Sequence, residues 1–62
     1  MKKAQKFIFR MADGKIKYLE GQNADHSLNQ IGSVVCWDGD SNTVDVRMPS
    51  GRVEKITFMG VR

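Results

Sequence analysis

The stretch from Gly32 to Met59 constrains the fold of this chain more than any other part of it. Three short runs rich in β-branched and aromatic residues lie in this stretch, separated by two loops of turn-forming residues. Runs of that kind between turn signals are typical of antiparallel strands that follow one another in a meander. We therefore expect three strands, at residues 33–37, 43–48 and 52–59.

A hairpin is predicted ahead of the meander. The run at residues 6–11 places Phe7, Phe9 and Met11 on one side of a strand, and Asp13-Gly14 follows it. An Asp-Gly pair between two such runs indicates a two-residue turn, because both central residues of that turn need positive φ. The strand after the turn then begins near residue 15.

A two-residue turn also fixes which residues of the hairpin lie opposite one another. Phe9 pairs with Tyr18, and Met11 pairs with Ile16, so that apolar side chains meet on one face. The opposite face then collects three basic residues, Lys6, Arg10 and Lys17.

The connection at residues 21–30 is polar and has too few apolar positions to support a full helix in water. We predict a loop with at most one helical turn, capped by Asn23 or Asp25. The next run, residues 33–37, is apolar on both faces, which favours a central strand covered on both sides. Cys36 is expected to be a small hydrophobic residue within that strand.

In the last two predicted strands, at residues 43–48 and 52–59, the alternation shows more clearly which side chains face the core. The fourth run alternates cleanly, with Val44 and Val46 directed inward. Pro49-Ser50-Gly51 then predicts a three-residue turn, since proline presets φ at its first position and glycine accepts the left-handed conformation at its last. A bulge near this turn would bring both Val53 and Ile56 to the core, and the sequence leaves that register open.

With 62 residues the chain forms one domain with a thin core, because a domain of this size buries only about 60% of its unfolded surface. We expect a flexible N-terminus at residues 1–5 and a single small β domain at residues 6–62. The predicted fold is all-β, a small five-stranded antiparallel curled sheet or partly open barrel made of a hairpin and a three-stranded meander. In strand order and size, residues 6–59 resemble the SH3-like small barrels, among them the small basic archaeal chromatin proteins that lay a three-stranded sheet on DNA.

Catalytic and metal-binding patterns are incomplete. Asp38, Asp40 and Asn42 have the spacing of the first half of a calcium-binding loop, but the rest of that motif is missing. Cys36 and His26, the single thiol and the single imidazole, are a weak candidate for a nucleophilic pair, because a cysteine in an apolar strand is inert. We therefore expect no enzyme, no metal and no cofactor.

A lone cysteine and the absence of a long apolar run suit a cytoplasmic protein that does not enter a membrane.

Charge is distributed unevenly along the chain. Residues 1–20 and 47–62 are basic, whereas residues 21–46 contain four Asp and no Lys or Arg. A nucleic-acid surface needs cations for phosphates and often an exposed aromatic ring that stacks on a base, which Trp37 or Tyr18 could supply. We therefore expect a small binding module for nucleic acid. Its predicted contact residues are Lys6, Arg10, Lys17, Arg47, Arg52, Lys55 and Trp37.

Two other functions remain open from the sequence. A protein inhibitor, of the kind that phages and mobile elements encode, would bind a host protein through an unpaired last strand at the sheet edge or through the acidic loop at residues 38–42. The contact residues in that loop would be Asp38, Asp40 and Asn42. A homodimer or larger oligomer with a small-molecule pocket between subunits would also relieve the thin core.

Overall fold

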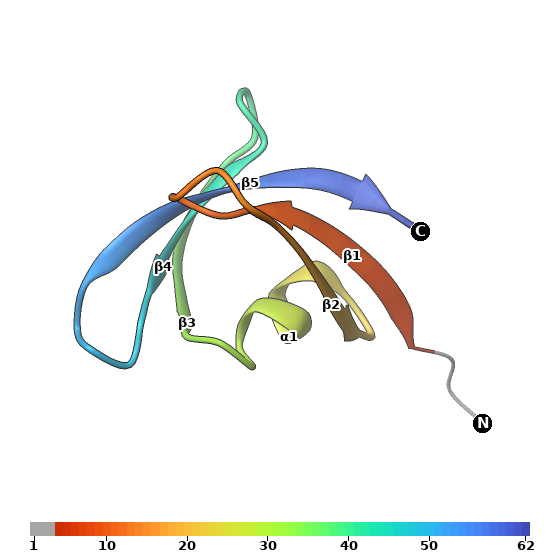
Figure 1. The fold of residues 1–62 in the computed structure, drawn as a ribbon, viewed down its shortest axis with the longest axis horizontal. Helices are drawn as coiled ribbons and strands as arrows, with labels where there is room; N and C mark the ends of the chain where they lie inside the picture. The colour runs from red at the N-terminus through yellow and green to blue at the C-terminus, as the bar shows by residue number, and fades with distance from the viewer. Residues whose placement is uncertain (1–3) are drawn as a thin grey trace.

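The computed structural model describes residues 4–62 as five strands and one short helix (Figure 1). In chain order the elements are β1 (Gln5–Arg10), β2 (Ile16–Gly21), α1 (Ala24–Leu28), β3 (Ser33–Asp38), β4 (Thr43–Arg47) and β5 (Val53–Val61). The predicted flexibility of residues 1–5 falls mostly outside this part of the chain, and Gln5 already belongs to β1. Within residues 4–62, no helix is long and apolar enough to cross a membrane.

The five strands form one antiparallel sheet in the order β2-β1-β5-β4-β3. The predicted hairpin and meander are both present, and the sheet curls into an arch without closing on itself (Figure 1). The last strand, β5, lies between β1 and β4, so it is not the edge strand that one form of the inhibitor hypothesis expected, although β1 pairs only with the part of β5 from Thr57 onward. β2 and β3 are the edges, so the predicted central position of residues 33–37 is wrong.

The β1–β2 hairpin has a different register from the predicted one. Phe9 lies opposite Lys17 and not opposite Tyr18. The turn contains three residues, 12–14, and this extra residue shifts the pairing by one and moves every side chain of β2 to the other face. Tyr18 is therefore exposed, and Leu19 packs in the core.

The β1–β2 and β4–β5 hairpins have the same kind of turn. In the first turn, residues 11–15, Met11 N–H donates to the Lys15 carbonyl at 2.8 Å, and Gly14 N–H donates to the Met11 carbonyl at 2.9 Å. The second turn, residues 48–52, has the same two hydrogen bonds, at 2.7 and 2.8 Å, and confirms the predicted three-residue turn. Gly14 and Gly51 have positive φ values of 88° and 92°, which glycine adopts without strain. The two sequences, Met-Ala-Asp-Gly-Lys and Met-Pro-Ser-Gly-Arg, share Met, Gly and a basic residue at matching positions.

The edge strand β3 contains a bulge at Val35. Val34 and Trp37, three residues apart, consequently both pack against the core. A regular strand would put them on opposite faces, as the sequence predicted. The bulge leaves Val35 and Cys36 exposed, so the predicted apolar setting of Cys36 is wrong.

The core lies on the inner face of the arch. Its buried apolar residues are Phe7, Phe9, Leu19, Leu28, Val44, Val46 and Ile56. The predicted inward positions of Val44 and Val46 are confirmed. β4 and β5 pair without a shift in register, with Ile56 opposite Val44, and Val53 therefore stays outside the core.

The short helix α1 contacts both edge strands and lies under the arch (Figure 1). Asn23 caps it, and its side chain accepts a hydrogen bond from a main-chain N–H of α1 at 2.7 Å. Trp37 Nε1 in β3 donates to Asp25 Oδ1 in α1, and Gln30 Nε2 donates to the Glu20 carbonyl in β2. The polar connection thus forms the single helical turn that its sequence predicts, and it links the two edges of the open sheet.

Candidate binding groove

An open groove of about 730 Å³ lies between the first turn and the start of β5. One wall is formed by the first turn with the first residues of β2, and the other by residues 52–55. Four of the side chains that line it are cationic and two are anionic, so we call it the basic groove. These charged residues are Asp13, Lys15, Lys17, Arg52, Glu54 and Lys55.

The first turn and the second turn present matching side chains to the basic groove. Each has a basic residue directly after its glycine, Lys15 in the first turn and Arg52 in the second. A β-branched residue follows in each case, and these residues, Ile16 and Val53, are 46% and 47% exposed. Because the turns have the same hydrogen bonds, equivalent positions supply a cation and an apolar side chain on each side of the groove.

Three predicted nucleic-acid-binding residues, Lys17, Arg52 and Lys55, line the basic groove together. They come from β2, the second turn and β5, segments that are distant in the sequence. Lys15 also lines the groove, although it is not among the predicted site residues. The repeated pattern of a glycine followed by a basic residue, shared with Arg52, is the signal that could have identified Lys15.

The remaining predicted cations do not line the basic groove. Lys6 lies opposite Glu20, at the end of the hairpin away from the first turn. Arg10 ends β1 and Arg47 ends β4, and both are exposed. The predicted grouping of Lys6 and Arg10 with Lys17 on one face is wrong, because the three-residue turn reverses the faces of β2.

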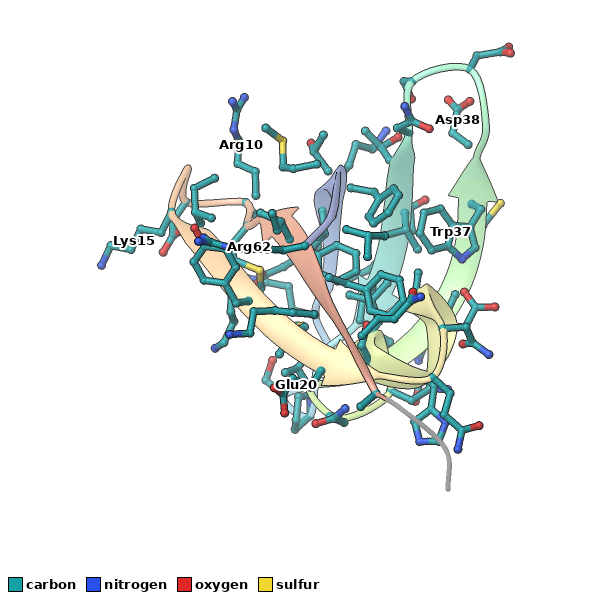
Figure 2. All side chains as sticks on the ribbon, turned by 90° about the vertical axis from the view of Figure 1, so that its right-hand side faces the viewer. Arg10, Lys15, Glu20, Trp37, Asp38 and Arg62 are labelled. Carbon is teal, nitrogen blue, oxygen red and sulfur yellow. The ribbon has the colours of Figure 1, made fainter. Side chains whose placement is uncertain are left out.

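Trp37, the predicted stacking residue, is half-buried and packs against the core. Its ring meets the Phe58 ring edge-on with centroids 6.3 Å apart, and its Nε1 donates to Asp25. Trp37 lies on the opposite side of the molecule from Lys15 in Figure 2. Among residues 4–62, the exposed aromatic residue is Tyr18, with 52% of its surface accessible.

β5 borders the basic groove with an unpaired edge. β1 pairs with β5 only from Thr57 onward and then leaves the sheet at the first turn. Within residues 4–62, Val53 to Ile56 pair with β4 alone. The side of β5 that faces the first turn is therefore open over four residues.

Two hydrogen bonds define the direction of the main-chain groups at this open edge. Phe58 N–H donates to a carbonyl of the β3–β4 loop at 2.8 Å, and the Arg52 carbonyl accepts from the start of the second turn at 2.7 Å. Residues 52 and 58 therefore direct these groups toward β4. Successive residues of a strand direct them to opposite sides. Val53 and Lys55 consequently direct their N–H and C=O groups to the open edge, into the basic groove.

The acidic loop predicted to contact a protein partner is exposed at Asp38, Asp40 and Asn42. The N–H of Asp40 donates to Asp38 Oδ1 at 3.0 Å. This hydrogen bond, together with one from the Ser41 side chain, lowers the pKa of Asp38 below its usual value. Asn42 has a positive φ of 56°, and its carbonyl accepts from Phe58 N–H. These contacts explain the polar residues of the loop as parts of the β3–β4 turn.

Cys36 and His26 lie on different elements, β3 and α1, and both are exposed. Cys36 Sγ donates to the carbonyl of Trp37 at 3.6 Å. Across the described part of the chain, no group of three His, Cys, Asp or Glu side chains gathers as metal ligands would.

Comparison with models of known protein families, with curated protein sequences and with solved structures finds no match for this chain.

Proposed function

We propose that the protein binds single-stranded nucleic acid in the basic groove. The observation that carries the proposal is that two hairpins, distant in sequence, place four cations along one open groove. These cations are Lys15, Lys17, Arg52 and Lys55. Lys and Arg side chains that neutralise phosphates release condensed counterions, which supplies most of the affinity of non-specific binding.

The apolar side chains of the groove favour a single strand over a duplex. A single strand exposes the faces of its bases, and those faces stack on aromatic and apolar side chains. Ile16 and Val53 line the groove with the cations, and Tyr18 follows Ile16 on the exposed face of β2. Bases can contact these three side chains while the phosphates contact Lys and Arg.

A reducing compartment is part of the proposal. Free thiols persist in the cytosol, whereas oxidising compartments favour disulfides. The chain has a single cysteine, Cys36, and its thiol is exposed, which fits a cytoplasmic site of action.

Fluorescence anisotropy with labelled single-stranded DNA, single-stranded RNA and the matching DNA duplex tests the proposal. We expect single strands to bind, with an affinity that falls steeply as salt is added. Four phosphate contacts correspond to a slope of about −3 in a plot of log affinity against log salt concentration. Tighter binding of the duplex, or no binding of single strands at low salt, would contradict the proposal.

Lys15→Glu and Lys6→Glu form a matched pair of charge reversals, one inside the basic groove and one outside it. Lys15→Glu should weaken binding to every sequence and reduce the salt slope by about 0.7, the contribution of one contact to a single strand. Lys6→Glu should change both quantities far less. Equal effects of the two variants would indicate general attraction to a basic protein and not a groove.

A further inference from the structure

We infer that the open edge of β5 in the basic groove pairs with an extended acidic segment of another protein, which joins the sheet as an additional strand. An unpaired strand edge is a template for pairing with another chain. Val53 and Lys55 direct their N–H and C=O groups to this edge, and they have the two-residue spacing that a neighbouring strand uses. The four open residues, Val53 to Ile56, allow a short ladder of main-chain hydrogen bonds.

The positive charge of the basic groove favours a segment with acidic side chains. Lys15 and Lys17 lie on one wall, and Arg52 and Lys55 lie on the other. Glu or Asp side chains on a strand between these walls would lie near Lys55 on one face of the sheet and near Lys17 on the other, and opposite charges on neighbouring strands stabilise their pairing. A second copy of this chain would instead bring its own Arg52 and Lys55 against the same two residues. Like charges opposed across a strand pair are destabilising, so the groove disfavours self-pairing.

This inference goes beyond the proposed function and concerns the same groove. An acidic polypeptide strand and a single strand of nucleic acid are both extended and anionic, and both would contact the same four cations. We therefore expect them to compete. An acidic segment would then regulate nucleic-acid binding by occupying the groove.

Amide hydrogen exchange on the unaltered protein measures whether the N–H groups at the open edge of β5 have a hydrogen-bond partner. In the free protein, the N–H groups of Val53 and Lys55 should exchange fast, and those of Glu54 and Ile56, which face β4, should exchange slowly. The probe is a short peptide of alternating Glu and Thr. Saturation with this peptide should slow exchange at Val53 and Lys55 by about tenfold or more, because each N–H gains a main-chain partner.

Val53→Pro and Val53→Ala separate the main-chain contact from the side chain. Proline removes the N–H at the open edge and leaves the groups that pair with β4 in place, whereas alanine keeps that N–H. Val53→Pro should weaken peptide binding by about tenfold, the effect of one lost main-chain hydrogen bond. Val53→Ala should weaken it much less. If Val53→Pro does not fold, the exchange measurement and the modified peptide below still decide the question.

A second peptide carries the same carboxylates but is methylated at alternate main-chain nitrogens, so it cannot form the ladder. It should not bind, and binding equal to that of the unmodified peptide would overturn the inference, because charge alone would then suffice.

Unchanged exchange at Val53 and Lys55 with the acidic peptide, while an oligonucleotide still binds, would overturn the inference and retain the proposed function. Slow exchange without any peptide, together with a dimeric molar mass, would identify a second copy as the occupant. Failure of both ligands to bind would reject both proposals.

Discussion

The first turn and the second turn are built alike but join strands with different surroundings. They share two main-chain hydrogen bonds and a left-handed glycine. They also share a side-chain acceptor for the N–H after that glycine: Asp13 Oδ1 accepts from Lys15 at 2.9 Å, and Ser50 Oγ accepts from Arg52 at 3.4 Å. The first turn ends at the exposed edge strand β2, whereas the second joins two interior strands, β4 and β5. Turn geometry is thus a local property, while the cost of disturbing a hairpin depends on what its strands bury.

The largest expected difference in the free energy of unfolding is between substitutions to aspartate in β4 and in β2. Val46→Asp places an unpaired charge in the core beside the second turn and should destabilise the fold by about 4 kcal/mol or more, enough to unfold it. Tyr18→Asp, on the exposed face of β2, should cost only about 1 kcal/mol. Urea unfolding followed by circular dichroism measures both values. A stable Val46→Asp variant would mean that the inner face of β4 is wrongly assigned.

Replacing the turn glycines tests whether the turns are equivalent. Gly14→Ala and Gly51→Ala should each lower the free energy of unfolding by about 1–2 kcal/mol, because alanine is strained at positive φ. An added Cβ meets no atom within 4 Å at either position, so the loss comes from backbone strain and not from a steric clash. Thermal unfolding of the two variants provides the comparison. A difference well above 1 kcal/mol between them would show that the strands also influence the turns.

Transferring proline between the turns should produce opposite changes. Ala12 occupies the position of Pro49, directly after the first residue of its turn. Ala12→Pro should raise the free energy of unfolding by about 0.4–1 kcal/mol, since proline restricts the unfolded chain, and Pro49→Ala should lower it by a similar amount. Denaturant titration checks the signs. Destabilisation by Ala12→Pro would show that the first turn has a backbone conformation that proline cannot adopt.

The smallest expected effect concerns the side-chain acceptors. Asp13→Ala should cost about 0.5–1 kcal/mol, and Ser50→Ala should cost less, because the Ser50 hydrogen bond is longer. Both residues are exposed, which limits the two values. The two titrations need replicate measurements to resolve the difference. A larger loss for Ser50→Ala would contradict this ranking.

Strand positions could be predicted because alternation and turn residues are local signals, and the all-β fold with its hairpin and meander follows from them. The register of the first hairpin could not, because Asp-Gly suits both a two-residue and a three-residue turn, and a shift of one residue reverses every side chain of β2. The predicted placement of Val34 and Trp37 on opposite faces is wrong for a related reason. The bulge at Val35 depends on how an edge strand meets β4, which no short stretch of sequence encodes.

The candidate site was predictable in part. Charge alone predicts Lys17, Arg52 and Lys55 as contact residues, but their meeting in one groove depends on the pairing of β1 with β5. The aromatic ring of Trp37 predicts a stacking residue, but its hydrogen bond to Asp25 turns the ring toward α1. The open edge of β5 follows from where β1 ends, which is a property of the whole sheet.

The pairing of the first strand with the last one also governs how fast this protein reaches its fold. Arg10 pairs with Thr57, and Arg62 N–H donates to the Lys6 carbonyl at 2.7 Å, so this ladder joins segments from opposite ends of the described chain. Each hairpin can form alone within about 1–10 μs, whereas distant pairings form slowly because a long loop must close first. We therefore expect the folding rate to depend on the encounter of β1 with β5, and the local turns to have little influence on it.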